Sequence, residues 1–454
     1  MIRLALLEQT ANELQWLLEE SAPDESGAFC LLREGKGRQG SRLIATEVLL
    51  PPQDAWERQG RGILRPKAKW ISAAISCAVR AHAGLLFVHS HPDPCFPLGL
   101  SLTDLNAFNS LARNLVPTFD GPFGAAVVHP AGWAGVVWSG SSITPIAAIY
   151  KVGRTLQTLS PIEPLENTPI DDRQRDALGM IHDRLRGMDV GIVGCGGIGS
   201  PIAEQLVRMG VRSLTVVDFD HLDTPSNVRR NFGSTLSDLN AAIPPRKVDV
   251  IFRHAANLGL GVPVLPIHGD VRHEDVFRNL LDTDVVVCAT DNHGSRAVVN
   301  DLASAYLLPV IDIGVRAGSK ARNVLSALVA EVRILTPTTP CLWCRRAIDA
   351  QVIRAENLPQ TERQKLMQEG YLLGAASDPE PTVVALTVLG AGLATCALLA
   401  LLSQEADVSP SGYWVDGFLG DSQETNPKHP TEGCRCRKQL GLGDNSPPPF
   451  LRAD

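Results

Sequence analysis

Residues 190–200, VGIVGCGGIGS, decide the fold of the second half of the chain. Val190–Val193 is an apolar run typical of a buried strand, and the segment that follows it opens a predicted helix. Glycines let a backbone approach phosphate groups closely, and a helix N-terminus adds unpaired N–H groups and partial positive charge. The glycines concerned are Gly194, Gly196, Gly197 and Gly199. The stretch therefore predicts a nucleotide-binding strand–loop–helix unit.

The sequence after this loop extends the pattern. Asp218 lies 19 residues beyond Gly199, at the end of the next predicted strand, where an acidic residue binds ribose hydroxyls. Near-continuous apolar runs separated by helices indicate a parallel sheet covered on both faces. The further runs are Ser213–Val217, Val262–Ile267, Val285–Ala289 and Val310–Ile313. Taken alone, these features suit an NAD-dependent oxidoreductase equally well.

Three short blocks are more specific. The residues 217–220 (VDFD) lead to 226–230 (SNVRR), and 289–292 (ATDN) follow later. Together they resemble the D-F-D, S-N-x-x-R and T-D-N blocks of the ThiF-like and ubiquitin-activating family, over roughly residues 173 to 436. The resemblance implies a Rossmann-like adenylation domain with a mostly parallel sheet. Members use ATP to adenylate the C-terminal glycine of a ubiquitin-like protein.

The resemblance implies a role for each polar residue near the nucleotide. Attack of a carboxylate on the α-phosphate brings negative groups together, so cations and a metal must neutralise them. Asp218 would hold the ribose, with Asp220 beside it among the nucleotide-binding residues. Asn227 and Arg230 would contact the phosphates.

The remaining implied residues concern charge and assembly. Lys247 would lie near the developing negative charge, with Arg246 as its alternative, and Asp291 would bind Mg2+. Arg173 matches an arginine that family dimers insert into the partner's site, which implies a homodimer.

Two close cysteine pairs predict a second kind of site. They are Cys341 with Cys344 and Cys434 with Cys436. Four thiolates suit a closed, tetrahedral, structural Zn2+, which family members often carry, and His429 is a possible substitute ligand.

The segment Val383–Leu402 carries no charge and is long enough to span a bilayer. Its flanks are acidic and give no positive-inside signal, so we predict a buried helix of the α/β domain and no membrane partner. Residues 345–395 contain no cysteine, and Cys396 is expected to be packed core. We therefore expect no cysteine nucleophile, and the acyl-adenylate passes to a partner or meets a nucleophile from elsewhere.

The first half of the chain contains a different constellation. His89 and His91 end a buried apolar run before Pro92, and Ser101 and Asp104 follow. Two imidazoles and one carboxylate leave a coordination position open for water, which is the layout of a catalytic Zn2+. The H-S-H-P…S-x-x-D pattern resembles the JAB/MPN (JAMM) metalloproteases, which cut peptide and isopeptide bonds after ubiquitin-like tails.

By this resemblance His89, His91 and Asp104 are zinc ligands, and Ser101 donates a hydrogen bond to the oxyanion. The family also needs a glutamate general base upstream. Glu25 precedes an apolar run in a suitable context, and Glu47 is the weaker alternative.

The predicted organisation follows from these sites. A JAB/MPN α/β domain with a mixed sheet occupies residues 1–155, a Pro-rich linker 156–172, the adenylation domain 173–440 and a mobile tail 441–454. The resemblances together predict a bifunctional enzyme with a ubiquitin-like protein as partner and a conjugating enzyme as a further candidate. The alternatives are an adenylase of a small molecule or peptide, and a non-catalytic scaffold.

Composition restricts the function classes further. The chain has 454 residues with 44% hydrophobic and 20% charged residues, which fits a globular protein of two or three domains. A net charge of -7 argues against nucleic acid as a main partner. Ten cysteines without a secreted disulfide pattern, and no expected signal peptide, predict a cytoplasmic protein.

Overall fold

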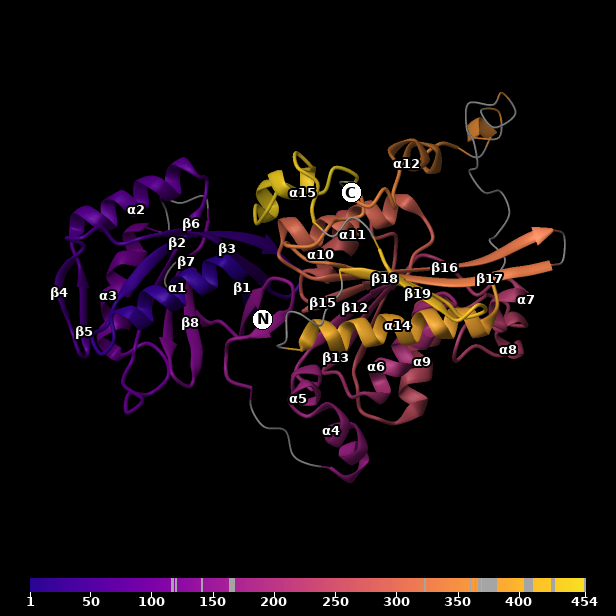
Figure 1. The fold of residues 1–454 in the computed structure, drawn as a ribbon, viewed down its shortest axis with the longest axis horizontal. Coiled ribbons are helices and arrows are strands. Elements are labelled where there is room, and N and C mark those ends of the chain that lie inside the picture. The colour runs from indigo at the N-terminus through magenta and orange to yellow at the C-terminus, as the bar shows by residue number, and fades with distance from the viewer. Residues whose placement is uncertain are drawn as a thin grey trace. The chain divides into compact units, whose positions relative to one another are not determined.

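The chain folds into two units, and each contains its own sheet (Figure 1). The computed structural model describes residues 1–115, 118, 121–139, 142–162, 168–321, 324–359, 361–363, 365, 369, 382–403, 411–425 and 429–452. The first unit comprises Met1–Pro164, Ala305–Leu307 and Gln439–Pro447. The second comprises Leu165–Ser304, Leu308–Lys438 and Pro448–Asp454.

The first unit is built on a mixed sheet of nine strands. In spatial order these are β11 (Leu156–Thr158), β10 (Ala148–Val152), β1 (Ile2–Leu7), β3 (Ser41–Leu49), β2 (Gly27–Lys36), β6 (Gly84–Ser90), β7 (Phe123–His129), β8 (Gly132–Ser139) and β9 (Ser142–Pro145). The pairs β1–β10, β1–β3 and β6–β7 are parallel and the others antiparallel. A separate hairpin joins β4 (Trp56–Gly60) to β5 (Ile63–Pro66). The mixed sheet agrees with the prediction.

Helices cover both faces of this sheet. Alternate side chains of β2 enter two cores, because neighbouring strand residues point to opposite faces. Ala28 and Cys30 pack in the core that contains Leu14 of α1 (Glu8–Glu20). Phe29 packs in the other core with Trp70 of α2 (Ala68–Arg80) and with α3 (Leu102–Leu115). The strand ends of β2 and β6 are thereby fixed between two packed layers.

The second unit contains an eight-stranded sheet. Its order is β14 (Val264–His268), β13 (Ser213–Asp218), β12 (Asp189–Val193), β15 (Val285–Cys288), β16 (Val310–Ala321), β17 (Val324–Leu335), β18 (Gly412–Asp416) and β19 (Asp421–Glu424). The five strands from β14 to β16 are parallel, as predicted. The pairs from β16 to β19 are antiparallel, so the sheet is mixed overall and less uniformly parallel than predicted. Strand β17 escaped prediction because its first half is partly exposed and lacks a continuous buried run.

Helices flank this second sheet. The longer ones are α6 (Gly199–Arg208), α9 (Lys247–Leu258), α11 (His293–Ala305) and α14 (Val384–Leu402). The shorter ones are α4 (Asp172–Leu178), α5 (Met180–Arg186), α7 (Pro225–Val228), α8 (Leu236–Leu239), α10 (Glu274–Leu280), α12 (Ala350–Glu356) and α15 (Arg435–Lys438), with the 3-10 turn η2 (Pro169–Asp171). The 3-10 turn η4 (Gly443–Asn445) belongs to the first unit. Gly179, with a φ of 53°, separates α4 from α5.

Helix α14 is the uncharged segment of the sequence. By length and composition it could cross a membrane, but half of it is buried within the unit. It packs against β16, β17, α5 and α6, and the Thr395 hydroxyl donates to Gln205 of α6 at 2.7 Å. These contacts confirm the prediction of a helix packed on the sheet.

The predicted linker and tail contain ordered structure. Leu156–Thr158, at the start of the predicted linker, pairs with β10, while residues 163–167 lie outside the described residues. In the predicted tail, both oxygens of Asp444 accept hydrogen bonds, from the Lys36 N–H at 2.9 Å and the Tyr306 hydroxyl at 3.1 Å. The prediction of a mobile tail missed these contacts because proline and glycine alone do not reveal where a segment packs.

Candidate functional site

The glycine loop follows β12 and leads into α6, as its sequence predicts. Gly194 has φ 95°, and a Cβ there would lie 2.7 Å from the Ala289 carbonyl oxygen. A Cβ on Gly199 would lie 1.8 Å from the Gly194 carbonyl oxygen. Side chains are therefore excluded, and the loop backbone lies close to the end of β15 with the α6 N-terminus behind it.

Asp218 fixes the shape of this loop. Its carboxylate accepts hydrogen bonds from the Cys195 N–H at 2.6 Å and the Asp220 N–H at 2.8 Å. Burial raises the pKa of Asp218, and the charge of Lys247 opposes that rise. The carboxylate thus connects the ends of β12 and β13. Its remaining lone pairs can accept hydrogen bonds from the hydroxyls of a ribose.

Lys247 lies among three carboxylates. Its Nζ contacts Asp220 Oδ2 at 2.6 Å, and its side chain is only 12% exposed. Burial would lower the pKa of Lys247, but the charges of Asp218, Asp220 and Asp291 outweigh it and raise the pKa. The alternative cation, Arg246, instead forms a backbone bridge with His221. Lys247 is therefore the charged amine of this site.

Arg230 approaches the loop from the other side. Its guanidinium donates to Asn227 Oδ1 at 3.2 Å, and a Cβ on Gly197 would meet the Arg230 Cβ at 3.2 Å and the Thr387 methyl at 3.3 Å. Asn231, which sequence reasoning missed, donates to the Cys195 carbonyl at 3.0 Å. Its place directly after the S-N-x-x-R block was the available signal.

The block 289–292 ends β15 and begins α11. Asn292 Oδ1 accepts the Ser295 N–H at 2.7 Å, and Asp291 is exposed. Glu356, from α12, accepts the N–H groups of His293 and Gly294, both at 2.8 Å. Asn292 and Glu356 thus accept the first N–H groups of α11. The Asp291 carboxylate is not needed for this capping and is available for a cation.

The four cysteines converge as predicted. The Sγ–Sγ distances are 3.6 Å for Cys341–Cys344, 3.7 Å for Cys341–Cys434 and 3.9 Å for Cys344–Cys436. Tetrahedral Zn–S bonds of about 2.3 Å require sulfur separations of about 3.8 Å, so the four thiols fit Zn2+. Burial would raise the pKa of Cys344, but the Thr431 N–H and the neighbouring thiols lower it to about 7. The alternative ligand His429 is not a member of this group.

His89, His91 and Asp104 also converge, within the first unit. The Nε2 atoms of His89 and His91 are 3.2 Å apart and lie 3.6 Å and 3.7 Å from Asp104 Oδ2. Bonds of about 2.0–2.1 Å to a tetrahedral zinc require edges of about 3.4 Å, which these distances match closely. Burial lowers the pKa of His89 and so favours the neutral imidazole that a metal needs.

Glu25 lies beside this triad and Glu47 does not. Glu25 is 6% exposed just before β2, whose first residue, Gly27, pairs with His89. Burial raises the pKa of Glu25, while the charges of His91 and Asp104 act on it in opposite directions. Glu47 instead pairs with Arg33 at 3.3 Å.

Ser101 forms hydrogen bonds at the first turn of α3. Its hydroxyl donates to Asp104 Oδ2 at 2.7 Å and accepts the Asp104 N–H at 3.1 Å. In this arrangement Ser101 orients the carboxylate of the triad, a contact that the predicted oxyanion role did not include.

Comparison with known proteins identifies the family to which the second unit is similar. Residues 172–436, more than half of the 454 residues, match the ThiF family. The chain belongs to the ThiF family. The match starts after the His89 triad and includes the nucleotide and cysteine sites.

Curated relatives of this ThiF-family chain are similar over shorter stretches. The sulfur carrier protein ThiS adenylyltransferase of Bacillus subtilis is 31% identical over 153 residues, 34% of this chain and 42% of that protein. The SAMP-activating enzyme E1 of Haloferax volcanii is 27% identical over 161 residues, 36% of this chain and 54% of that protein. The chain thus spans about half the length of these relatives. A crystal structure of E. coli MccB with ATP is 16% identical in sequence and is similar with a TM-score of 0.45, over 61% of this chain and 75% of that chain.

The exposure of two residues in the ThiF-family segment bears on the sequence predictions. Cys396 is exposed, which makes the prediction of packed core wrong. Only half of α14 is buried, and its apolar residues run all round the helix, so hydrophobicity does not indicate which positions are covered. Arg173 is exposed on α4, and its action across a dimer stays a prediction.

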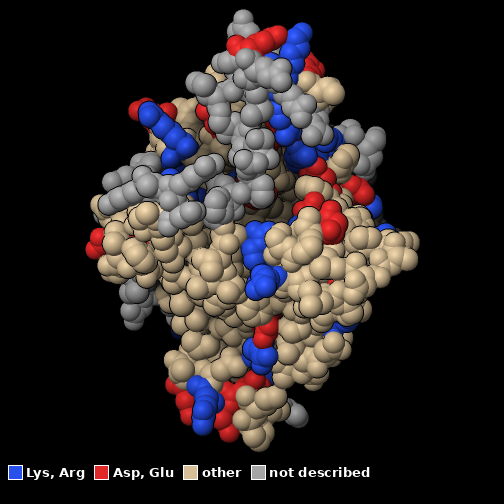
Figure 2. All heavy atoms as spheres, turned by 90° about the vertical axis from the view of Figure 1, so that its right-hand side faces the viewer, with Lys and Arg blue, Asp and Glu red and all other residues tan. Residues whose placement is uncertain are grey.

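Figure 2 shows one face of the molecule, on which Lys and Arg lie in small separate groups, several of them beside Asp and Glu. Among the described residues visible on that face there is no broad basic area of the kind that binds nucleic acid. The absence of a nucleic-acid partner stays a prediction.

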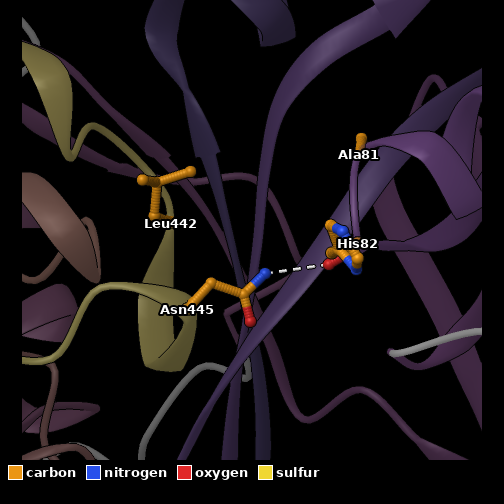
Figure 3. Close-up of a pocket in the computed structure, with 4 residues that line it drawn as sticks. All are labelled: Ala81, His82, Leu442 and Asn445. Atoms are coloured by element: carbon orange, nitrogen blue, oxygen red, sulfur yellow. Dashed lines mark hydrogen bonds between the residues drawn. The ribbon is translucent and has the colours of Figure 1, made fainter.

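A cavity of about 480 Å³ lies away from all of these residues. Ala81, His82, Leu442 and Asn445 line it within the first unit, and the Asn445 amide donates to the His82 carbonyl at 2.8 Å (Figure 3). The lining has no charged, nucleophilic or metal-binding cluster, so we assign it to the packing of the C-terminal segment.

Proposed function

We propose that the ThiF-family unit uses ATP and Mg2+ to adenylate the C-terminal carboxylate of a ubiquitin-like or sulfur carrier protein that ends in glycine. The observation that carries the proposal is Lys247, held 2.6 Å from Asp220 beside the carboxylate that braces the glycine loop. Such a preorganised cation stabilises charge that develops at a phosphate. The relatives described above, a ThiS adenylyltransferase and a SAMP-activating enzyme, favour a protein tail over a small molecule as the substrate.

Each residue of the nucleotide site would contact a different part of the bound ATP and Mg2+. The loop N–H groups and Arg230 would contact phosphate oxygens, and Asp218 would hold the ribose. Asp291, an exposed carboxylate at the end of β15, would bind Mg2+, which supplies positive charge between phosphates. We further propose that the unit acts as a cytoplasmic homodimer, with Arg173 reaching the partner's site.

Pyrophosphate exchange tests this function. The full chain should exchange labelled pyrophosphate into ATP only when a protein ending in glycine is added, and Asp291→Ala should abolish the exchange. Equal exchange with an unrelated free carboxylate, such as a short peptide, would favour the alternative adenylase. NAD binding without ATP binding would overturn the proposal in favour of an oxidoreductase.

We propose a second function for the first unit, a zinc-dependent peptidase or isopeptidase of the JAB/MPN type acting after the same tail. The specific observation is the convergence of two imidazole Nε2 atoms and one carboxylate oxygen at separations that fit a metal, with buried Glu25 beside them. A zinc ion held there would acidify a bound water. Glu25 would accept its proton and pass it to the leaving amine.

Matched glutamate variants test the peptidase. Glu25→Ala should keep the zinc content and reduce cleavage of a glycine-tailed fusion about a hundredfold or more, while sparing ATP–pyrophosphate exchange. Glu47→Ala is the control and should cleave normally. Cleavage that persists in Glu25→Ala but disappears in Glu47→Ala would identify the wrong base, and cleavage insensitive to a chelator would overturn the metallopeptidase.

A further inference from the structure

Two histidines lie at the carboxyl edge of the second sheet, beside Asp218. His268 ends β14, and the parallel register of β13 and β14 places it opposite Asp218. Partners in a parallel pair direct their side chains to the same face of the sheet. The His221 ring packs against His268 with centroids 4.9 Å apart and planes at 70°. The two rings are thus fixed next to the carboxylate that braces the glycine loop.

The backbone holds His221 in this position. His221 bridges to Arg246, and the hydrogen bonds on either side join Leu222 N–H to the Pro245 carbonyl at 2.8 Å and Lys247 N–H to the Asp220 carbonyl at 3.0 Å. The segment therefore cannot shift without disturbing Lys247, the cation of the site.

His268 has an unsatisfied polar atom. Its Nδ1 is buried and has no hydrogen-bond partner among the described residues. Buried polar atoms in native proteins almost always find a partner, and an exception calls for an explanation. A ligand that lies along this edge would supply one.

The order of the strands indicates which part of a nucleotide reaches His268. Strand β12 carries the glycine loop, β13 carries Asp218, and β14 is the next strand outward. Adjacent strands lie about 4.8 Å apart. With phosphates at the loop and ribose at Asp218, the base continues in the same direction, over the end of β14.

We propose that His268 binds the base of the nucleotide and contributes to the selection of adenine, with His221 as the residue that positions the His268 ring. Nδ1 lies in the plane of the imidazole ring and would pair with a polar atom on the edge of the base. This inference rests on the proposed ATP-dependent function.

Two probes separate base binding from phosphate binding. The full chain is titrated calorimetrically with Mg–ATP and with Mg–tripolyphosphate, which lacks both base and ribose. His268→Ala should weaken ATP binding about twofold to tenfold, the usual cost of losing one hydrogen bond. Its affinity for tripolyphosphate should not change, and its preference for ATP over GTP should fall.

Further variants address the positioning role and the fold. His221→Ala should weaken ATP binding and His221→Phe should restore it, because a second ring still packs on His268. His254→Gln is the matched control: His254 pairs with Glu204 at 2.9 Å on the outer helices, and its loss should change neither titration. A His221→Phe variant as weak as His221→Ala would overturn the positioning role.

The outcomes of these titrations distinguish the role of His268 from the proposed ATP-dependent function on which it rests. If the wild-type chain binds no ATP, the proposed function fails and the inference fails with it. If wild type binds ATP and His268→Ala binds it equally well, or loses ATP and tripolyphosphate alike, only the inference is overturned.

Discussion

Replacing Lys247 by methionine tests the charge balance of the nucleotide site most directly. Lys247 contacts Asp220 and offsets the charges of Asp218 and Asp291. Two unit charges about 4 Å apart interact by about 4 kcal/mol at an effective dielectric constant of 20. Because Asp220 is 46% exposed, solvent screening reduces the loss of stability to about 1–2 kcal/mol.

The destabilisation should depend on pH in a defined direction. Burial already raises the pKa of Asp218 in the folded state, and Lys247 limits that rise, so the methionine variant should raise it further. An acid with a raised folded pKa favours folding while it is protonated, below its unfolded pKa, and loses that contribution as pH rises through the folded pKa. The stability gap between variant and wild type should therefore be larger at pH 8 than at pH 5.

Thermal unfolding and pyrophosphate exchange measure the two consequences. Exchange should fall by about a hundredfold to a thousandfold, the typical cost of removing one preorganised group that stabilises developing charge. Lys365→Met is the control, because Lys365 is 74% exposed and its nearest acidic partner, Glu369, is 3.9 Å away. Near-normal exchange in Lys247→Met, or a stability gap that shrinks from pH 5 to pH 8, would refute the reasoning.

Three further predictions follow from the same unit. Cys341→Ser should remove one zinc equivalent, measured by metal analysis of the full chain, and lower the melting temperature; an unchanged zinc content would contradict the four-thiolate site. Mixing Arg173→Ala with Asp291→Ala protein should partly restore exchange, because a mixed dimer contains one site with both residues intact, and no rescue at any ratio would argue against donation across a dimer. Cys396→Ala should leave exchange intact and no reducible adduct should form on a non-reducing gel, although Cys396 is exposed, because adenylation itself needs no thiol; a thiol-sensitive adduct would show that a cysteine takes part.

The sequence predicted the local geometry of a site where its residues lie within a short stretch of the chain. The glycine loop and the block containing Asp218 each join a strand end to the next turn, and the C-x-x-C pair lies at a single turn, so local spacing fixes the geometry of each. The turn before an apolar strand also brings Glu25, and not Glu47, close to the His89 triad, while the role of Glu25 as general base stays a prediction. Prediction failed for Cys396, because hydrophobicity alone does not say which side of an apolar helix meets the sheet.

Contacts between distant parts of the chain could not be predicted in the same way. Glu356 caps α11 from 62 residues beyond Gly294, and Asp444 reaches Lys36 across 408 residues. Neither has a motif, because a carboxylate that accepts N–H groups needs only the correct place in space. Such contacts become visible once strand order and packing are known.

The histidine pair shows why this difference matters for function. His221 and His268 are 47 residues apart and belong to no motif, and only the register of β13 with β14 brings them together beside Asp218. Phosphate binding depends on backbone N–H groups and glycines, which leave a readable pattern in the sequence. Base binding depends on ring faces and single polar atoms, which many residue types can supply. The part of the site that selects the nucleotide is therefore the part that the sequence describes least, and the His268 titrations test it independently of the phosphate site.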